Sequence, residues 1–431
     1  MLNTLINAFK EKEIRNKMLL TLLMLLIFRL GCFIPVPGIA SGSFQSLSSN
    51  DFFSIMSTIT GGSLQNGTLF ALGIIPFINA FIIMQLLTLI IPPLDKLSKS
   101  GEEGRKKITQ ITRYMAILLA VIQGVGICLG WGNGMFDETF GSTSLSMALV
   151  IIMFVGGSCL VMWIADRITE YGIGNGTSLI IFVGILASAG QSLLSALAKV
   201  GDGDVAKNVW LIIAFLVVVL FVFVFIIFVD LAERKIAVKY SQQVKGRKLY
   251  GGQTTYIPMK VNAGGVMPII FASSFLMFPQ MIASFWPQSA FYQWWAQYLG
   301  IGTPIYIVVM SLLILFFAFF YSQIQFNPED IARNLQQNGA TLQQPEIRPG
   351  KPTELYLKKI NNRITLFGAI FLAILSLVPS IVFKFIGSEN GLANAFSATG
   401  LLIVVSVAME FDTQLQNQLM MRQYRGKGFL K

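Results

Sequence analysis

Long runs of apolar residues, nearly free of charge, limit how this chain can fold more than any other feature. A helix needs roughly 20 consecutive, mostly apolar residues to cross the hydrocarbon core of a bilayer. The chain has ten runs close to that length, near residues 18–36, 72–92, 113–132, 144–165, 177–198, 208–229, 263–285, 304–325, 364–385 and 394–411. Charged residues make up only 12% of the sequence, about half the usual share in a soluble domain. The sequence therefore predicts an all-α polytopic membrane protein with ten transmembrane helices.

The distribution of Lys and Arg predicts how these spans are oriented. Ten spans place both termini on the same side of the membrane, and nearly all of the 32 basic residues fall on that side. The exceptions are Arg29, Lys199, Lys207 and Lys384. Because loops rich in Lys and Arg remain cytoplasmic, we expect both termini in the cytoplasm. We divide the chain into five parts. A cytoplasmic amphipathic segment (1–17) precedes an N-terminal half with spans 1–5 (18–198). An external hinge loop (199–207) leads to a C-terminal half with spans 6–10 (208–416) and a basic cytoplasmic tail (417–431).

Two cytoplasmic loops are longer than this topology requires. They cover residues 230–262 and 326–363 and mix basic residues with Gly, Pro, Gln and Tyr. Long loops on one face of a membrane protein often form a docking surface. A basic loop suits an anionic partner such as lipid headgroups, RNA or an acidic protein face. Charge alone is equally compatible with simple anchoring of the spans.

The ionisable residues give no sign of a catalytic or metal site. The chain has no histidine, and its three cysteines, which match neither a disulfide framework nor a metal site, are interpreted as small core residues. No acidic residue lies near the middle of a span, and no phosphate-binding or dinucleotide motif is complete. We therefore expect no enzyme activity, no metal and no cofactor. Arg29 is the clearly embedded charge, for which snorkelling and pairing with backbone carbonyls both remain open.

A half-polar segment precedes the second span. Residues 61–68 read GGSLQNGT, which is too polar to face lipid comfortably and too uncharged for an ordinary solvent loop. Several spans are also interrupted by Pro or Gly, and irregular backbone at membrane depth must be shielded by protein or line an aqueous cavity. A cavity without ionisable groups favours a large or size-gated path over an ion-coupled site.

Eight segments, spread in order over nearly the whole chain, are similar to those of one protein family. They read FRLGCFIPVPGI (28–39), GGSLQNGTLFALGIIPFINAFIIMQLL (61–87), WIADRITEYGIGNGTSLIIF (163–182), ERKIAVKYSQQ (233–243), IPMKVNAGGVMPIIFASS (257–274), NPEDIARNLQQNGA (327–340), IRPGKPTELYL (347–357) and ATGLLIVVSVAME (398–410). On these segments the chain resembles the SecY family, the central subunits of bacterial protein-conducting channels. The ten-span frame, with both termini cytoplasmic, agrees with that resemblance.

The resemblance implies an architecture and a set of pore residues. SecY-like proteins have two inverted-repeat halves around a central hourglass pore, with a plug half-helix on the external side and a lateral gate formed by spans 2, 3, 7 and 8. Five spans in each half permit that symmetry. The apolar ring at the constriction matches Ile74, Ile78, Ile181, Ile185, Ile270 and Ile403. The plug matches about residues 53–68, including Gly61, Gly62, Ser63, Leu64, Gln65 and Asn66.

The resemblance also implies partners. The two long loops match surfaces that dock the ribosome and the SecA motor ATPase, and Arg348 matches a position implicated in motor coupling. Basic residues that are candidates to contact ribosomal RNA phosphates are Arg234, Lys235, Lys245, Arg247 and Lys248. The small membrane subunits SecE and SecG, signal sequences, nascent chains and membrane lipids complete the implied set.

The predicted function is that of a protein-conducting channel subunit in the cytoplasmic membrane of a bacterium. It translocates unfolded secretory proteins and releases transmembrane helices laterally into lipid, with energy supplied by its partners. A secondary transporter for a small solute is the alternative, because it also predicts ten or more spans and an inverted repeat. Such a transporter requires an ionisable or cation-coordinating cluster at mid-membrane, which the sequence lacks. A scaffold or insertase without a pore leaves the broken helices and the half-polar segment unexplained.

Overall fold

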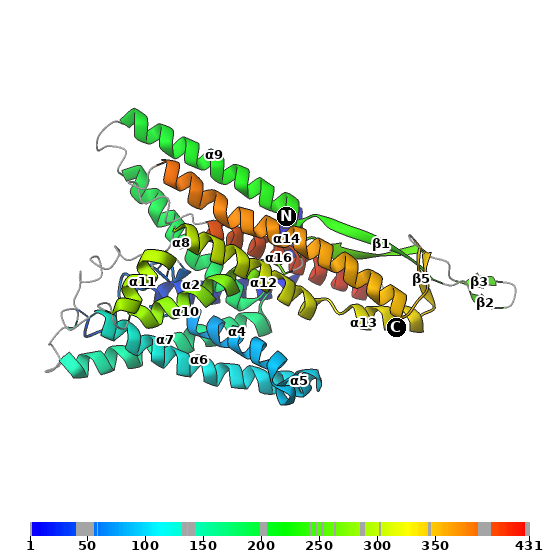
Figure 1. Cartoon of the computed structure of the whole chain (residues 1–431), viewed down its shortest axis with the longest axis horizontal. Coiled ribbons are helices and arrows are strands. Elements are labelled where there is room, and N and C mark those ends of the chain that lie inside the picture. Colours follow the sequence, from blue (N-terminus) through cyan, green and yellow to red (C-terminus); the bar gives the residue numbers. More distant parts are fainter. Residues whose placement is uncertain are drawn as a thin grey trace.

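The computed structural model of the chain is mostly helical, and strands project from one end of the helical body (Figure 1). It describes residues 2–39, 56–57, 59–131, 136, 143–198, 205–240, 243–245, 248–250, 254–262, 264–284, 289–300, 303–343, 346–386 and 398–426.

Each predicted span overlaps a helix of the body. These helices are α2 (Lys12–Gly31), α4 (Ile75–Ile90), α6 (Glu102–Trp131), α7 (Thr143–Tyr171), α8 (Gly176–Ala198), α9 (Val205–Asp230), α10 (Met267–Ser284), α12 (Pro304–Gln325), α14 (Lys351–Ile386) and α16 (Ala398–Gly426). Shorter helices are α1 (Leu2–Lys10), α5 (Pro92–Lys99), α11 (Ala290–Leu299) and α13 (Pro328–Gln337).

Several of these helices have the length and composition needed to cross a membrane. In the described part of the chain, four segments meet both criteria: Glu102–Leu129, Thr143–Tyr171, Gly176–Ser195 and Pro304–Gln337. Helices α4 and α5, bent by 103°, add a fifth if they are taken as one span. Large apolar side chains also face outward, among them Phe228 at 74% and Ile152 at 71% exposed, as expected of lipid-facing residues. That the chain has ten membrane spans remains a prediction.

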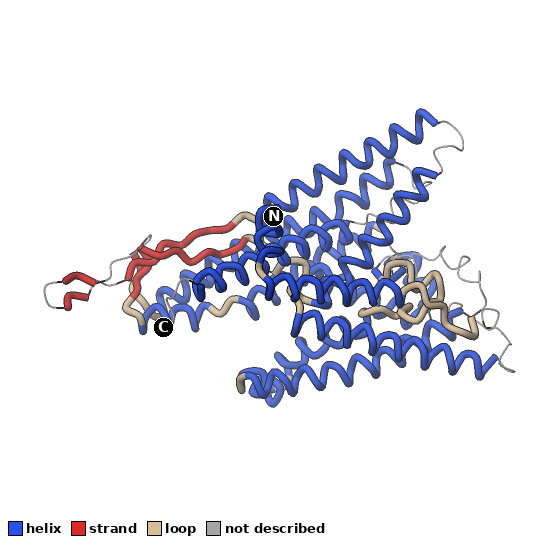
Figure 2. Tube along the Cα trace, turned by 180° about the vertical axis from the view of Figure 1, so that it is seen from behind, coloured by secondary structure: helices blue, strands red, loops and turns tan. Residues whose placement is uncertain are grey.

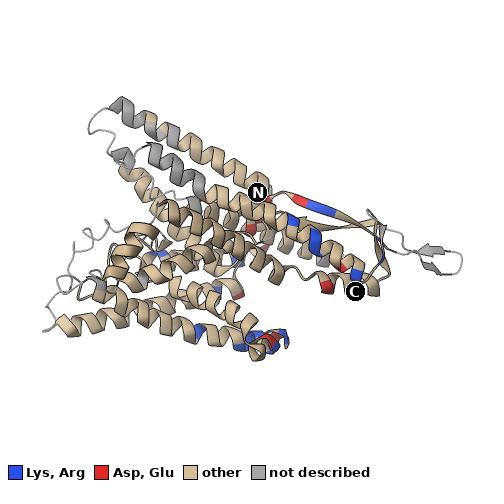
Figure 3. Cartoon of the chain, in the orientation of Figure 1, with Lys and Arg blue, Asp and Glu red and all other residues tan. Residues whose placement is uncertain are grey.

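Charged side chains are unevenly distributed over the body. Figure 3 shows Lys, Arg, Asp and Glu concentrated around α5, around the projecting strands and on the neighbouring part of α14. All of these belong to segments that the sequence predicts to be cytoplasmic. The Lys and Arg residues in these regions are among those on which the predicted orientation rests.

The two long loops that the sequence predicts to be cytoplasmic form one sheet. Strands β1 (Glu233–Tyr240), β4 (Thr254–Lys260), β5 (Ala340–Gln343) and β6 (Glu346–Ile347) pair in the order β4-β1-β5-β6. Strand β1 of the first loop therefore pairs with β5 of the second, in antiparallel orientation. A separate hairpin, β2 (Gln243–Lys245) with β3 (Lys248–Tyr250), extends from the first loop. Figure 2 shows both strand groups in red beyond the helices.

A small apolar core fixes this sheet to the helices. Val238 of β1 and Leu342 of β5 face each other in register and are each 1% exposed. They belong to one cluster with Leu335 of α13 and Leu357 of α14. The expectation of an all-α fold therefore omits this sheet. Helices α13 and α14 also begin within the predicted loop 326–363, so part of that loop is helical.

The largest apolar cluster joins helices from both predicted halves. It contains Phe28 of α2, Ile164 of α7, Val222 of α9 and Phe317 of α12. Helix α10 packs against α4 and α6 of the first half as well as against α12 of the second. The core of the molecule therefore lies where the two halves meet.

Candidate functional site

All six isoleucines matched to the apolar ring lie in this central cluster. Their side chains are between 3% and 8% exposed. They come from the start of α4, from α8, from α10 and from α16, so both predicted halves contribute. Residues far apart in the sequence are thus brought into one buried apolar contact network.

The start of α4 places Ile74 and Ile78 on the same face of the helix, because they are four residues apart. Ile74 directly precedes α4, and the Ile78 amide donates to the Ile74 carbonyl at 3.1 Å. Pro76 lies in the first turn of the helix, where a missing N–H leaves no bond unmade. Gly73 has a φ of +55°, a value that glycine adopts without strain, and lets the irregular chain turn into the helix.

The predicted plug, about residues 53–68, is described only in part. Residues 53–55 and 58 lie outside the described residues. Helical geometry at 56, 57 and 59 agrees with a short half-helix, and turns follow from residue 60 onward. Gly61 and Gly62 have φ values of +71° and +86°, which favour glycine. A role as a movable plug stays a prediction.

We call residues 59–68 the cover segment. Ser63 and Leu64 are buried within it, at 0% and 2% exposed, whereas Gln65 and Asn66 are exposed. The Ser63 hydroxyl donates to the backbone carbonyl three residues earlier, at 2.8 Å. Hydroxyl side chains of this kind stabilise turns by bonding to nearby backbone groups. Part of the polar character that does not suit lipid thus serves hydrogen bonds within the compact turns of the cover segment.

The cover segment lies against α8 and the central cluster. A Cβ added to Gly184 would come within 2.4 Å of the Ile59 carbonyl oxygen, so the close approach requires glycine at this position. Ile59 packs against the cluster that holds the isoleucines, and Gly184 directly precedes Ile185. The cover segment therefore contacts the part of α8 that supplies Ile185, one of the residues of the predicted ring.

The embedded Arg29 of α2 has a backbone partner in the cover segment. Its Nη1 donates to the carbonyl oxygen of Gly61 at 2.8 Å. Its guanidinium carbon lies 4.8 Å from the centre of the Phe33 ring, within the range of a cation–π contact. Of the two possibilities that the sequence leaves open for Arg29, the structure has the pairing with a backbone carbonyl.

The chain that leaves the cover segment is fixed by the end of α2. The Val36 amide donates to the Gly67 carbonyl at 3.0 Å, and the Leu69 amide donates to the Ile34 carbonyl at 2.9 Å. These bonds flank a short antiparallel bridge between the two segments. Backbone groups that lipid would leave unpaired are therefore satisfied within the protein.

Helix α7 packs closely against the segment that links residue 68 to α4. A Cβ on Gly157 would lie 1.9 Å from the Leu69 carbonyl oxygen, whereas one on Gly156 would meet open space. The next residue, Ser158, donates its hydroxyl to the Gly73 carbonyl at 3.2 Å. Ser158, one of the single buried polar residues of the spans, thus holds the linker between the cover segment and α4.

Aromatic rings connect the helices predicted to form the lateral gate. Phe81 of α4 meets Phe271 of α10 edge to face, with ring centroids 6.4 Å apart. Phe271 also contacts Phe317 and Tyr321 of α12, at 5.7 Å and 6.1 Å. The Phe81–Phe271 pair crosses the boundary between the two predicted halves, and the other two contacts hold α10 against α12 within the second half.

The predicted docking residues lie on and beside the sheet. Arg234 and Lys235 are exposed on β1, and Lys235 forms an ion pair with Glu233 at 3.1 Å. Arg348 is exposed in the turn before α14, where its carbonyl accepts from the Thr353 hydroxyl at 2.8 Å. Lys245 and Lys248 belong to the β2–β3 hairpin, and Arg247 lies outside the described residues.

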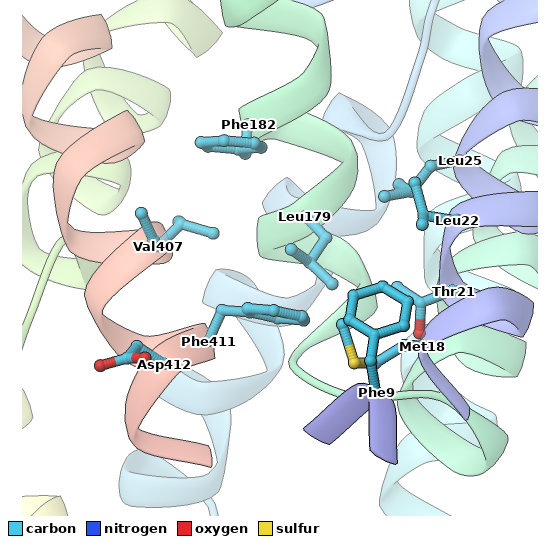
Figure 4. Close-up of a pocket in the computed structure, with 11 residues that line it drawn as sticks. Phe9, Met18, Thr21, Leu22, Leu25, Leu179, Phe182, Val407, Phe411 and Asp412 are labelled. Carbon is cyan, nitrogen blue, oxygen red and sulfur yellow. The ribbon is translucent and has the colours of Figure 1, made fainter. Parts of the chain in front are cut away.

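Figure 4 shows an apolar groove that the sequence did not predict. It has a volume of about 450 Å³ and is lined by Phe9, Met18, Thr21, Leu22, Leu25, Leu179, Phe182, Val407, Ala408, Phe411 and Asp412. The side chains of Phe9, Leu179 and Phe411 converge on it. Because its walls come from α1, α2 and α8 on one side and α16 on the other, the groove bridges the two predicted halves.

Comparison with known sequences gives one consistent family. The family model SecY matches residues 68–411 of the chain. The chain is 40% identical over 433 residues to the protein translocase subunit SecY of Thermus thermophilus, covering 99% of this chain and 97% of that one. It is also 40% identical over 438 residues to the protein translocase subunit SecY of Bacillus subtilis, covering 99% of each chain.

Solved structures share the fold. A protein-conducting channel superposes with a TM-score of 0.69 at 21% identity, covering 96% of this chain and 94% of that one. A structure of SecY whose plug domain is described as stabilising the closed state gives 0.67 at 20% identity, with the same coverage. Sec61 from the canine ribosome–channel complex gives 0.66 at 21% identity, again over 96% and 94%.

The close approach of α7 to the Leu69 backbone predicts different effects for two adjacent glycines. Gly157→Ala forces a methyl group into the Leu69 carbonyl and should destabilise the chain by about 1–3 kcal/mol. Gly156→Ala should be neutral or slightly stabilising, since alanine is the better helix former. Thermal unfolding of the purified protein measures both. Equal midpoints for the two variants would contradict the packing described here.

Proposed function

The chain belongs to the SecY family, and from that premise we propose that it is the channel subunit of a protein translocase. It is a multi-pass membrane protein that conducts unfolded secretory proteins across the cytoplasmic membrane of a bacterium and releases apolar helices sideways into lipid. It acts as a channel and not as an enzyme. The observation that supports this function most directly is the meeting of six isoleucines from both halves in one buried cluster. The solute transporter finds no support in the relatives described above, which are translocase subunits or channels of this fold.

The isoleucine cluster acts as the seal of the resting channel. A ring of β-branched apolar side chains is stiff at χ1, offers an ion no ligand and holds water poorly. It therefore excludes ions without recognising any particular sequence. During transport the same side chains contact a passing polypeptide only through their apolar surfaces, so they fit chains of many sequences.

The boundary between α4, α6, α10 and α12 is the lateral gate of this proposal. The edge-to-face contact of Phe81 with Phe271 joins α4 to α10 across this boundary and supports its role as a contact of the closed gate. Aromatic pairs of this kind contribute about 0.5–1.5 kcal/mol beyond the area they bury. Such a contact is weak enough to separate when an apolar helix offers replacement contacts. The inverted-repeat halves, the hinge at 199–207 and the cytoplasmic location of both termini belong to the same proposal.

The joined cytoplasmic sheet is the proposed docking surface for the ribosome and for the SecA motor. A relative by fold, Sec61, comes from a ribosome-bound complex. Because β1 and β5 pair, the exposed residues Arg234 and Arg348 belong to one rigid unit and not to two independent loops. Basic side chains held in this way attract ribosomal RNA phosphates or an acidic protein face.

The apolar groove of Figure 4 is the proposed seat of a small helical subunit such as SecE. Its walls carry little that a polar ligand would bind, and they come from both halves of the chain. A helix lying there would hold the two halves together at a distance from the gate. SecG, signal sequences, nascent chains and membrane lipids complete the proposed partners.

Asparagine in the ring tests the seal. The double substitution Ile74→Asn and Ile270→Asn should hydrate the constriction and raise the resting ion leak by about tenfold or more, because a buried amide favours water by about 1–3 kcal/mol. Signal-sequence selectivity should relax as well. Single-channel recordings and export assays measure the two effects.

The matched control is Ile127→Asn. Ile127 is also buried, at 2% exposed, but it lies in a separate cluster. This variant should lower stability without adding leak. If the double variant leaks no more than this control, the six isoleucines do not form the seal.

Charge reversal tests docking. Arg348→Glu should reduce motor-driven export several-fold while leaving assembly intact, because the side chain is exposed. Lys358→Glu, at an exposed position of α14, makes the same charge change as a control and should have a smaller effect. Normal export by the Arg348 variant, measured in membrane vesicles, would refute this docking assignment.

A further inference from the structure

We propose that Arg29 is a positioning residue that latches the cover segment over the isoleucine cluster. This inference rests on the proposed channel function and assigns to one side chain the task of holding the resting state. It begins from the cost of a cation within a membrane span, which is tolerated where the charge has a partner.

The partner of Arg29 is the cover segment itself. Its Nη1 donates to the Gly61 carbonyl at 2.8 Å, across 32 residues of sequence. A hydrogen bond from a charged donor is roughly twice as strong as a neutral one. None of the ion pairs formed by the described residues includes Arg29, so no carboxylate there competes for the guanidinium.

The position of Gly61 makes the bond effective as a latch. A Cβ on Gly61 would lie 2.9 Å from the Arg29 Nη1 and 3.2 Å from the Gly184 Cα, so this residue is enclosed between α2 and α8. Its φ of +71° also favours glycine. The backbone at this point is thus shaped to place a carbonyl between the two helices, beside ring residue Ile185.

Opening would break this bond. When the cover segment moves away, the cation of α2 loses the Gly61 carbonyl, and in this proposal water entering the pore takes its place. The closed state therefore bonds the embedded charge to the cover segment, and the open state bonds it to water. Arg29 in this way couples the position of the cover segment to the hydration of the channel.

The test compares Arg29→Met with Arg29→Lys in the full chain reconstituted in proteoliposomes. Arg29→Met keeps the bulk but removes the donor, and it should raise the resting ion leak on the order of tenfold. Arg29→Lys keeps a charged donor and should leak less than Arg29→Met. Arg15→Met removes an exposed arginine from the same helix and should leave the leak at the wild-type level.

A cross-link separates loss of the latch from general misfolding. The side chains of Asn66 and Gln191 are exposed, and each has an atom within 3.9 Å of the point where Gly62 would carry a Cβ. Cysteines at these two positions, in a chain whose native cysteines are replaced by alanine, accept a short thiol cross-linker. The cross-link should restore the seal of the Arg29→Met variant by holding the cover segment against α8.

Three outcomes would overturn the latch. They are a wild-type seal in Arg29→Met, equal leak in the Met and Lys variants, and a leak that survives the cross-link. The double asparagine variant of the ring distinguishes this failure from failure of the channel function. If that variant leaks and Arg29→Met does not, the channel stands and the latch is wrong. If neither leaks, both proposals are wrong.

Discussion

Irregular backbone inside a membrane-embedded helical body is the constraint on which the rest of the structure depends. Residues 60–74 form turns between α2 and α4, at a place where unpaired backbone groups would be costly in lipid. The surrounding helices supply the missing partners: Arg29 from α2, Ser158 from α7 and the backbone at 34–36. Glycines at 157 and 184 let two of these helices approach closely enough to do so.

This arrangement joins the cover segment and the isoleucine cluster into one unit. Ile59 packs on the cluster, and the chain from the cover segment leads directly into Ile74 at the start of α4. An apolar seal alone excludes ions but has no fixed closed state. In the proposed channel, a polar turn held by a charged donor and by close glycine contacts supplies that state, while the proposed seal keeps its sequence-independent surface.

The sequence predicts the helices well because long apolar runs have few other ways to fold. The six isoleucines were matched only through the family resemblance, because their meeting depends on contacts between helices that no local pattern encodes, and their role as a ring stays a prediction. The sheet of β4, β1, β5 and β6 was missed, even though buried Ile236 and Val238 alternate with exposed or half-exposed residues on β1, as a half-buried strand requires. The partner of Arg29 could not be predicted, because a backbone carbonyl 32 residues away leaves no signature in residue type. The groove could not be predicted either, because most of its lining residues are apolar residues of a kind found throughout the spans.

The central claim is that a translocating chain passes through the isoleucine cluster. Site-specific photo-cross-linking to a secretory chain halted in transit tests it most directly. We predict that a photoreactive residue at Ile78 or Ile403 cross-links to the halted chain, whereas one at Phe228, which is 74% exposed on the outer surface, does not. Absence of cross-links from Ile78 and Ile403, or equal cross-linking from all three positions, would contradict the claim.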